Sequence, residues 1–535
     1  MFMKKGIVIF FFLQFFQIVY GQNEFVTIWK PSIPAHNYQY AGITVSSLGN
    51  EIWLPVKGNN YTIYWEEVGY PSHNATLINI TSAYHTLINF GTALNPNAQN
   101  ATYRVKVSEG NGDFVGIYFR DFNLFPNSNG IVGDVTKIIN IEQWGNNSWV
   151  SMHEAFGGCV NMNVSATDNP DFTNTTDLSF MFQGCSSFSG NATINNWDVS
   201  NITNLIAIFS SCTLFNQPLN NWDTSNVIAM GAAFTLAQNF NQPLDNWDTS
   251  NVVTMTAMFN HAKKFNQPIG NWDLSNNLDC EFMFSNAWDF NQPIGNWNTS
   301  NVIEMNNMFT GASSFNQPIG NWNTGNVTNM SGMFLYATLF NQDINSWNTS
   351  NVIYFANMFN TATTFNQNLG NWNLSDATSA QNMFLNSGLS CQNYDSTLYG
   401  WSNNPATPQN IALSNVSPLK YSHPAAVNAR NNLINSKGWS ISGDIYDSEC
   451  QSFLSTVDNL ISEEISIYPN PVAESVFIKN LKNVNRFTIT DASGRILMKD
   501  VINKNFIGVE HLMPGNYILQ LITKSGAHTF KFIKK

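Results

Sequence analysis

Large apolar residues return at a fixed interval through the middle of the chain. Tryptophan and phenylalanine each recur about every 25 residues, with Asn, Gln, Thr and Ser between them. The tryptophans are Trp197, Trp222, Trp247, Trp272, Trp297, Trp322, Trp347 and Trp372, and the matching phenylalanines lie at 156, 182, 209, 234, 259, 284, 309, 334, 359 and 384. A period of this length is typical of stacked coils, because one unit alone cannot bury its apolar edge. We therefore expect ten coils within residues 131–390.

The apolar positions inside one unit predict a short strand followed by a short helix. Residues 218–223 begin with a proline, which tends to start strands because it cannot donate to a ladder. Val227, Met230, Phe234 and Ala237 then lie at i, i+3, i+7 and i+10, the spacing of one helical face. The Thr-Ser-Asn run just before them supplies capping residues. Each coil is therefore expected to combine strand and helix.

The repeat unit also carries two longer motifs. The first coil contains Ala155-Phe156-x-x-Cys159, and later coils have Met-Phe-x-x-Ala at the same place. These residues resemble the signature of BspA-type leucine-rich repeats, and the unit Trp-Asp-Thr-Ser-Asn-Val-x-x-Met-x-x-Met-Phe resembles a surface-protein repeat of mycoplasma lipoproteins. The resemblance covers residues 140–450 and implies a secreted or surface protein of a family associated with adhesion. The predicted fold class is thus a mixed α/β repeat solenoid, leucine-rich-repeat-like, flanked by an N-terminal β-sandwich-like domain and a C-terminal β-sandwich domain.

The tryptophan and phenylalanine rows are expected to form the core of the stack rather than an aromatic platform for a ligand. Three of the six cysteines follow the same logic, because they stand where later coils carry alanine. These small buried residues are Cys159, Cys185 and Cys212, and Cys280 stands where other coils carry methionine. We assign none of these four a ligand role.

The residue after each tryptophan is a candidate metal ligand. It is Asp198, Asp223, Asp248 and Asp273 in four coils and asparagine in the next four. Stacked carboxylates repel one another unless screened, so Ca²⁺ between coils is one interpretation. The other is a local turn in which the side-chain oxygen accepts a hydrogen bond from the backbone two residues on, a role that asparagine fills equally well. We favour the turn and expect no cofactor.

The N-terminal part of the chain predicts export and a small β-domain. Residues 1–21 have the charged head and short apolar run of a secretory signal, and no later apolar run is long enough to span a membrane. Residues 22–130 contain alternating segments such as 61–65 and 103–107, typical of an Ig-type sandwich. This stretch resembles a PKD-like module, although Trp65-Glu66-Glu67-Val68-Gly69 replaces the usual Trp-Gly-Asp-Gly segment.

The C-terminal part differs from the rest in charge. Residues 465–535 hold ten Lys or Arg against four Asp or Glu, while the whole chain has a net charge of -12. This change of sign marks a domain boundary, preceded by a linker at 452–464. Within the tail, Tyr468-Pro469-Asn470-Pro471, Asp491-Ala492-Ser493-Gly494-Arg495, Leu512-Met513-Pro514-Gly515-Asn516-Tyr517 and the terminal Phe530-Lys531-Phe532-Ile533-Lys534-Lys535 resemble the sorting domain of the type IX secretion system. The resemblance implies passage through that machinery to the outer surface of a Gram-negative bacterium.

Residues 391–451 break the period and are predicted to cap the last coil. Cys391 and Cys450 bracket this cap, so in an exported protein they form either a disulfide or two free thiols.

Composition and motifs narrow the function. The shortage of Lys and Arg argues against nucleic acid or anionic membranes as partners. No H-E-x-x-H, G-x-S-x-G or phosphate-binding glycine motif occurs, and we identify no catalytic residue. We therefore expect a non-catalytic binding scaffold that recognises an extracellular protein or glycan through solvent-facing positions such as Ile228-Ala229 and Val253-Thr254. The alternatives are a structural envelope or matrix protein without a defined ligand and a polysaccharide-processing enzyme.

Overall fold

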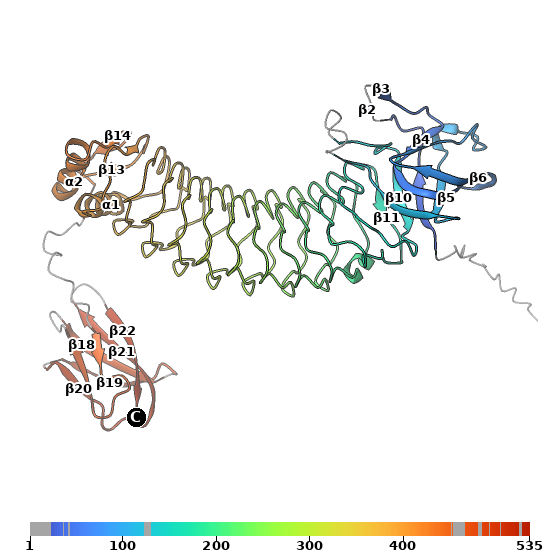
Figure 1. Cartoon of the computed structure of the whole chain (residues 1–535). Helices are drawn as coiled ribbons and strands as arrows, with labels where there is room; N and C mark the ends of the chain where they lie inside the picture. Colours follow the sequence, from blue (N-terminus) through green and yellow to red (C-terminus); the bar gives the residue numbers. More distant parts are fainter. Residues whose placement is uncertain are drawn as a thin grey trace, which may run out of the picture. The chain divides into compact units, whose positions relative to one another are not determined.

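The fold is taken from a computed structural model of the whole chain (Figure 1). It describes residues 23–535 except 36, 41–42, 122–129, 451, 453–465, 480–483, 492, 503 and 524–526. The predicted signal at 1–21 and the predicted linker at 452–464, apart from Ser452, lie outside the described residues. The chain divides into two compact units, Met1–Ser452 and Phe453–Lys535. Within the described residues, no helix combines the length and apolar character needed to cross a bilayer.

The first unit begins with a seven-stranded sheet in the order β11-β10-β1-β8-β5-β6, with β9 paired to β5. Alternate residues of β5 and β8 are buried, which gives the sheet one core-facing side. The strands of this sheet are β1 (Phe25–Trp29), β5 (Val56–Glu67), β6 (Tyr70–Ser82), β8 (Tyr103–Ser108), β9 (Asp113–Ile117), β10 (Ile138–Gln143) and β11 (Asn163–Val164). Two further pairs are β2 (Tyr38–Tyr40) with β3 (Ile43–Val45) and β4 (Glu51–Leu54) with β7 (Thr86–Asn89).

This sheet closes the N-terminal end of the repeats. Strand β11 belongs to the first coil and pairs in parallel with β10 of the sheet. The rings of Phe25 and Phe156 lie 6.5 Å apart, and those of Trp144 and Trp197 lie 5.5 Å apart. One continuous hydrophobic core therefore runs from the sheet into the coils.

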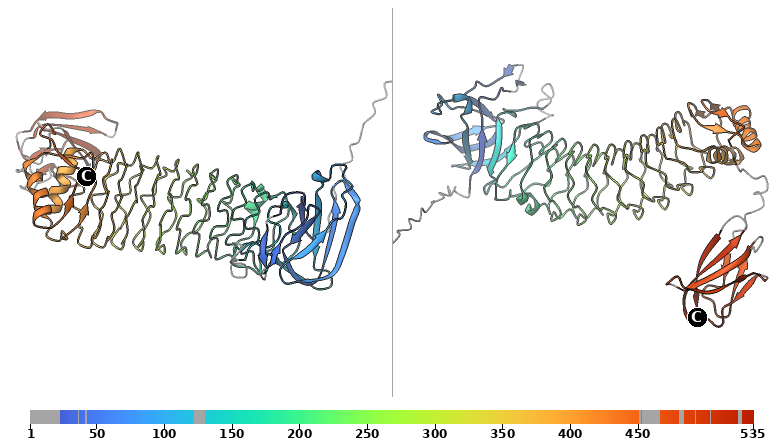
Figure 2. Two further views of the ribbon diagram at one scale, coloured as in Figure 1. Left: turned by 90° about the horizontal axis from the view of Figure 1, so that it is seen from above. Right: turned by 180° about the vertical axis from the view of Figure 1, so that it is seen from behind.

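The repeats form a row of coils (Figures 1 and 2), which we call the repeat stack. The prediction of a mixed α/β leucine-rich-repeat-like solenoid is wrong. Between Trp197 and Ser390, where every residue is described, the chain has no helix and only single-residue parallel bridges between neighbouring coils. A short 3-10 helix, η3 (Ala192–Asn196), lies just before this stretch, and η1 (Ala98–Asn100) lies in the N-terminal sheet region. The repeat stack is built from turns.

The expected helix fails because its N–H groups bond to the next coil. The backbone N–H of Met230, Ala232, Phe234 and Leu236 donate to carbonyls one coil further on, at 2.7–3.2 Å. Ala232 and Leu236 also have positive φ, which a right-handed helix does not allow. The apolar side chains still share one side, because two successive turns imitate the helical spacing.

Rows of rings fill the repeat stack. Phenylalanines of neighbouring coils stack at centroid distances of 5.6–6.0 Å from Phe182 to Phe384. A second phenylalanine row, from Phe188 to Phe365, stacks at 5.6–6.1 Å. From Trp222 to Trp372, each indole Nε1–H donates to a carbonyl of the preceding coil at 2.8–3.1 Å. Packing and hydrogen bonding thus fix the same register.

One coil carries a buried polar residue where its neighbours carry valine. Asn277 is fully buried between Val252 and Val302 in the sequence pattern, and its Nδ2 has no hydrogen-bond partner among the described residues. Its Oδ1 accepts from the backbone N–H of Asp279 and from Cys280 Sγ. A buried donor without a partner costs about 1–3 kcal/mol.

Replacing Asn277 by valine is therefore expected to raise the free energy of unfolding by about 1 kcal/mol, measured by urea unfolding. The matched control is Asn276→Val next to it, which loses the bond from Asn276 Nδ2 to the Ser250 carbonyl and relieves no buried group. If both variants lowered the free energy of unfolding equally, the unpaired Asn277 amide would not destabilise the fold.

The C-terminal cap makes the contacts that a further coil would make, but it makes them with helices and short strands. It consists of α1 (Cys391–Asn403), α2 (Pro424–Asn435), β12 (Ala412–Leu413) with β14 (Ser440–Ile441), and β13 (Lys420–Tyr421) with β15 (Ile445–Tyr446). The Ser390 N–H donates to Asn366 Oδ1, and Asn393 Nδ2 donates to the Asn366 carbonyl. The Trp401 Nε1–H donates to the Leu369 carbonyl at 2.8 Å. These bonds replace those that another coil would make.

The second unit is a small β-structure with its own core. One sheet has three strands, β16 (Ser466–Tyr468), β17 (Ser475–Lys479) and β20 (Phe506–Gly508). The other runs in the order β19 (Ile496–Val501), β18 (Val484–Asp491), β21 (Gly515–Thr523) and β22 (Ala527–Lys534). Val476, Ile489, Leu519 and Phe532 lie in the buried cluster that both sheets share.

Candidate functional site

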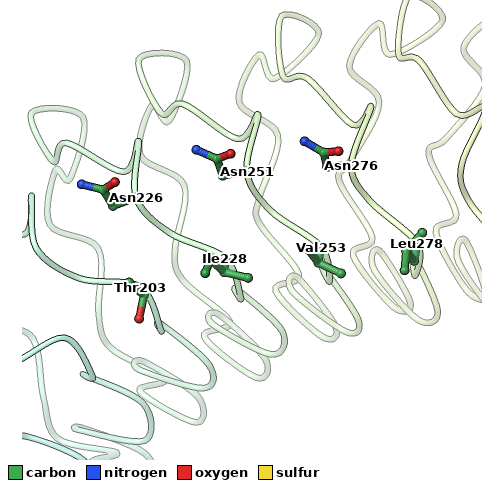
Figure 3. Close-up of a pocket in the computed structure, with 7 residues that line it drawn as sticks. All are labelled: Thr203, Asn226, Ile228, Asn251, Val253, Asn276 and Leu278. Carbon is green, nitrogen blue, oxygen red and sulfur yellow. The ribbon is translucent and has the colours of Figure 1, made fainter.

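A shallow groove of about 510 Å³ crosses several coils of the repeat stack (Figure 3). Its floor is a row of residues that directly follow one buried position of each coil, which is Ile202, Val227, Val252 or Asn277. Their backbones form a ladder in which Val253 N–H donates to the Ile228 carbonyl and Leu278 N–H donates to the Val253 carbonyl, at 2.8 and 2.9 Å. This spacing is that of neighbouring strands, ~4.8 Å.

The floor row is apolar and exposed in four consecutive coils. Ile228, Val253 and Leu278 line the groove and have exposed fractions of 50%, 37% and 42%, and Ile303 continues the row into the next coil with 39%. Thr203 precedes them and Thr328 follows them at the same position, so the fold itself does not need an aliphatic side chain here. A contiguous exposed aliphatic row marks a contact surface more often than scattered apolar residues do.

A row of asparagines forms one side of the groove. In Figure 3, Asn226, Asn251 and Asn276 lie in line above the floor row. Each amide Nδ2 donates to a carbonyl of the preceding coil at 2.6–2.8 Å, and the same bond recurs in the next three coils. Among the described residues, no group donates a hydrogen bond to the Oδ1 atoms of Asn226, Asn251 and Asn276, which are exposed. The row therefore presents acceptor oxygens to solvent at regular spacing.

The surroundings of the groove are acidic. Residues 150–397 contain sixteen Asp or Glu but only two Lys or Arg, which are Lys263 and Lys264. Asp279 and Glu304 lie beside the floor row and are bridge partners in neighbouring coils. The electrostatic potential along the groove is therefore negative and favours neutral or cationic ligands over anionic ones.

The four candidate metal ligands each take part in a local turn. The side-chain oxygen of Asp198, Asp223, Asp248 and Asp273 accepts from the backbone N–H two residues on, at 2.8–3.1 Å. The asparagines of the later coils make the same bond at 3.0–3.2 Å. Bonds from the hydroxyl and then the N–H of Ser200 lower the pKa of Asp198, and those of Ser250 lower the pKa of Asp248. Across the described residues, no three His, Cys, Asp or Glu side chains are grouped to hold a metal ion.

The eight tryptophans of the repeat are buried, with exposed fractions of at most 3%. The structure does expose a tryptophan outside that row, which the periodic pattern did not single out. Trp288 is 47% exposed, and Lys263 Nζ lies 4.2 Å from the centre of its ring.

The cysteines fall into two groups. Cys391 and Cys450 are joined in a disulfide with their Cα atoms 6.2 Å apart. Cys159, Cys185, Cys212 and Cys280 are free and buried, and burial raises the pKa of each thiol. None of these four is a reactive thiolate at neutral pH.

The asparagine row was missed in the sequence as a functional feature. Its signal was present, because an asparagine precedes the buried valine in most coils while the residue after the valine varies. The sequence does not reveal that each Nδ2 is used between coils and each Oδ1 faces outward.

Comparison with known families agrees with this division of the chain. Residues 150–244, 219–314 and 278–397 match the model of a family described as Mycoplasma protein of unknown function, DUF285. Residues 466–535 match a secretion system C-terminal sorting domain. No curated protein matches the chain. The expected mycoplasma-type repeat and sorting domain are therefore confirmed, whereas neither match supports the BspA-type leucine-rich repeat.

The sorting domain also establishes where the protein goes. A chain with this domain interacts with the type IX secretion machinery and is delivered to the outside of the cell. The protein is thus a secreted or surface protein that carries the repeat stack outside the cell.

Proposed function

We propose that this protein is a non-catalytic, adhesin-like scaffold whose groove on the repeat stack binds an extracellular ligand. The observation that carries the proposal is the exposed aliphatic row Ile228, Val253, Leu278 and Ile303. These side chains lie on a hydrogen-bonded backbone ladder, so they are held in place before a ligand arrives. Preorganisation of this kind reduces the entropy lost on binding.

The groove has the form of a recognition surface rather than of a reaction centre. It is open along the repeat stack and repeats the same groups in each coil, whereas catalysis needs different groups converging on one point. Delivery to the cell surface places this groove where it meets external molecules.

Replacing the four aliphatic residues by threonine is expected to reduce ligand binding at least tenfold without unfolding the chain, because threonine occurs naturally at positions 203 and 328 of the same row. The matched control is Leu214→Thr with Leu339→Thr, two residues that are each 53% exposed outside the groove. Binding of the mature chain to an array of glycans and matrix proteins measures the effect. An array that stayed blank would favour a structural protein instead.

We also propose that the stack works without a metal ion. One oxygen, Oδ1, of each of Asp198, Asp223, Asp248 and Asp273 already accepts a backbone N–H, so a cation bound there would have to compete with the turns. Calorimetric titration of the mature chain with Ca²⁺ is expected to give no heat and no change in melting temperature. A saturable signal that disappears when the four aspartates are replaced by asparagine would contradict this.

A further inference from the structure

We infer that the ligand of the groove is a neutral, extended, β-linked glycan that lies along the repeat stack with about one hexose per coil. This inference rests on the proposed function and names its ligand class. Three observations carry it: the spacing of the two rows, the hydrogen-bonding groups that they leave free, and the charge around them.

The spacing of the groove suits a sugar chain better than a polypeptide. The backbone ladder from Thr203 to Ile303 sets a repeat of ~4.8 Å, which is close to the length that one hexose adds to an extended β-linked chain. An extended peptide presents N–H groups to one side only every second residue, or about every 6.7 Å. Its donors would fall out of register with the asparagine row after one coil. Successive hexoses of a β-1,4-linked chain are turned over relative to one another, but each has hydroxyls on both edges, so every sugar still offers a donor to the asparagine of its coil.

The free groups of the groove are complementary to a hexose. The Nδ2 atoms of Asn226, Asn251 and Asn276 are used within the repeat stack, so each side chain offers an acceptor oxygen to the ligand. Sugar hydroxyls are donors and can fill one such acceptor per coil. Below them, Ile228 and Val253 provide aliphatic surface against which the C–H face of a sugar ring can pack.

Charge excludes the common anionic polymers. With sixteen acids and two bases over residues 150–397, uronate, sulfated or phosphorylated chains would meet like charge along the whole repeat stack. Asp279 and Glu304 directly follow Leu278 and Ile303 in the chain and add to this repulsion. A neutral chain meets no such repulsion.

The test uses neutral β-1,4-linked gluco- and manno-oligosaccharides of increasing length, titrated calorimetrically into the mature protein. We expect affinity for at least one series to rise with each added sugar up to about four, the number of consecutive aliphatic coils, and then to level off. Oligomannuronate of the same length, which is β-1,4-linked and anionic, is expected not to bind. The fourfold threonine variant should lose at least tenfold in affinity, and the Leu214→Thr, Leu339→Thr control should match the parent.

Two outcomes separate the inference from the proposed function. In the first outcome, a basic or neutral peptide binds in the groove, its affinity falls in the threonine variant, and the glycans do not bind. This would support the proposed binding scaffold and contradict the glycan as its ligand. If glycans bound with equal affinity to the parent and the threonine variant, the groove would not be their site and both proposals would fall. Circular dichroism of each variant confirms that a loss of binding is not a loss of fold.

Discussion

Replacing Trp322 by alanine is expected to lower the free energy of unfolding of the repeat stack by about 3–5 kcal/mol. Trp322 is 3% exposed and stacks on Trp297 at 6.2 Å and on Trp347 at 6.3 Å. Its Nε1–H also donates to the Ile294 carbonyl at 3.0 Å, so the truncation removes this bond between coils and leaves that carbonyl only the N–H of Trp297. Each coil contacts only its neighbours, and one substitution therefore weakens two successive interfaces.

The measurement combines urea unfolding of the mature chain with hydrogen exchange of the coil amides. Faster exchange is expected first in the coils next to Trp322, because a linear array can open locally at its weakest interface. The control is Trp288→Ala, the same chemical change at a side chain that is 47% exposed and contacts Lys263. Loss of that contact should cost no more than about 1 kcal/mol. Equal losses in the two variants would show that the tryptophan row does not hold the coils together.

The period of the repeat was sufficient to predict burial of the tryptophan row. A large apolar ring repeated every 25 residues is removed from water only when the units stack on one another. The turns after each tryptophan were also accessible, since Asp198 and Ser200 are two residues apart and interact locally. Both predictions depend on contacts that are short in sequence or repeated without variation.

The predicted helix failed because its alternative lies outside the local sequence. Tyr336 and Thr361 have positive φ, although neither residue favours it, and the bonds that hold them there run from their N–H groups to Asn360 and Leu385 in the next coil. A pattern read within one unit contains no information on those partners. Spacing at i, i+3 and i+7 shows which side chains share a face and does not distinguish a helix from successive turns.

Only part of the groove could be predicted from the sequence, for the same reason. Variation at Ile228 and Val253 indicated solvent-facing positions. That these positions form a continuous row beside unpaired Asn251 and Asn276 oxygens follows from the stacking of coils, in which each amide nitrogen is bound to the coil before it.

Removal of the Cys391–Cys450 disulfide is expected to lower the stability of the C-terminal cap by about 2–4 kcal/mol. The bond joins residues 59 positions apart, so in the unfolded chain it closes a long loop and restricts its entropy. In the folded chain it ties the start of α1 to the end of the cap, where Ser422 Oγ also donates to the Cys450 carbonyl. Without it, the cap is expected to detach from the last coil before the coils themselves unfold.

The effect is measured as the melting temperature of the mature chain with and without reductant, compared with the Cys391→Ser, Cys450→Ser variant. Reductant should lower the melting temperature of the parent and leave the double variant unchanged, because only the parent holds a bond to reduce. Cys212→Ala is the control in the repeat stack, since alanine occupies its position in later coils and Cys212 is free. A cap that kept its stability in both the reduced parent and the double variant would show that packing of Trp401 on Phe384, with ring centres 6.1 Å apart, is sufficient to seal the stack. We expect instead that the bond is needed, because α1 offers the last coil a single stacked ring in place of the two phenylalanine rows and one tryptophan row of a complete coil.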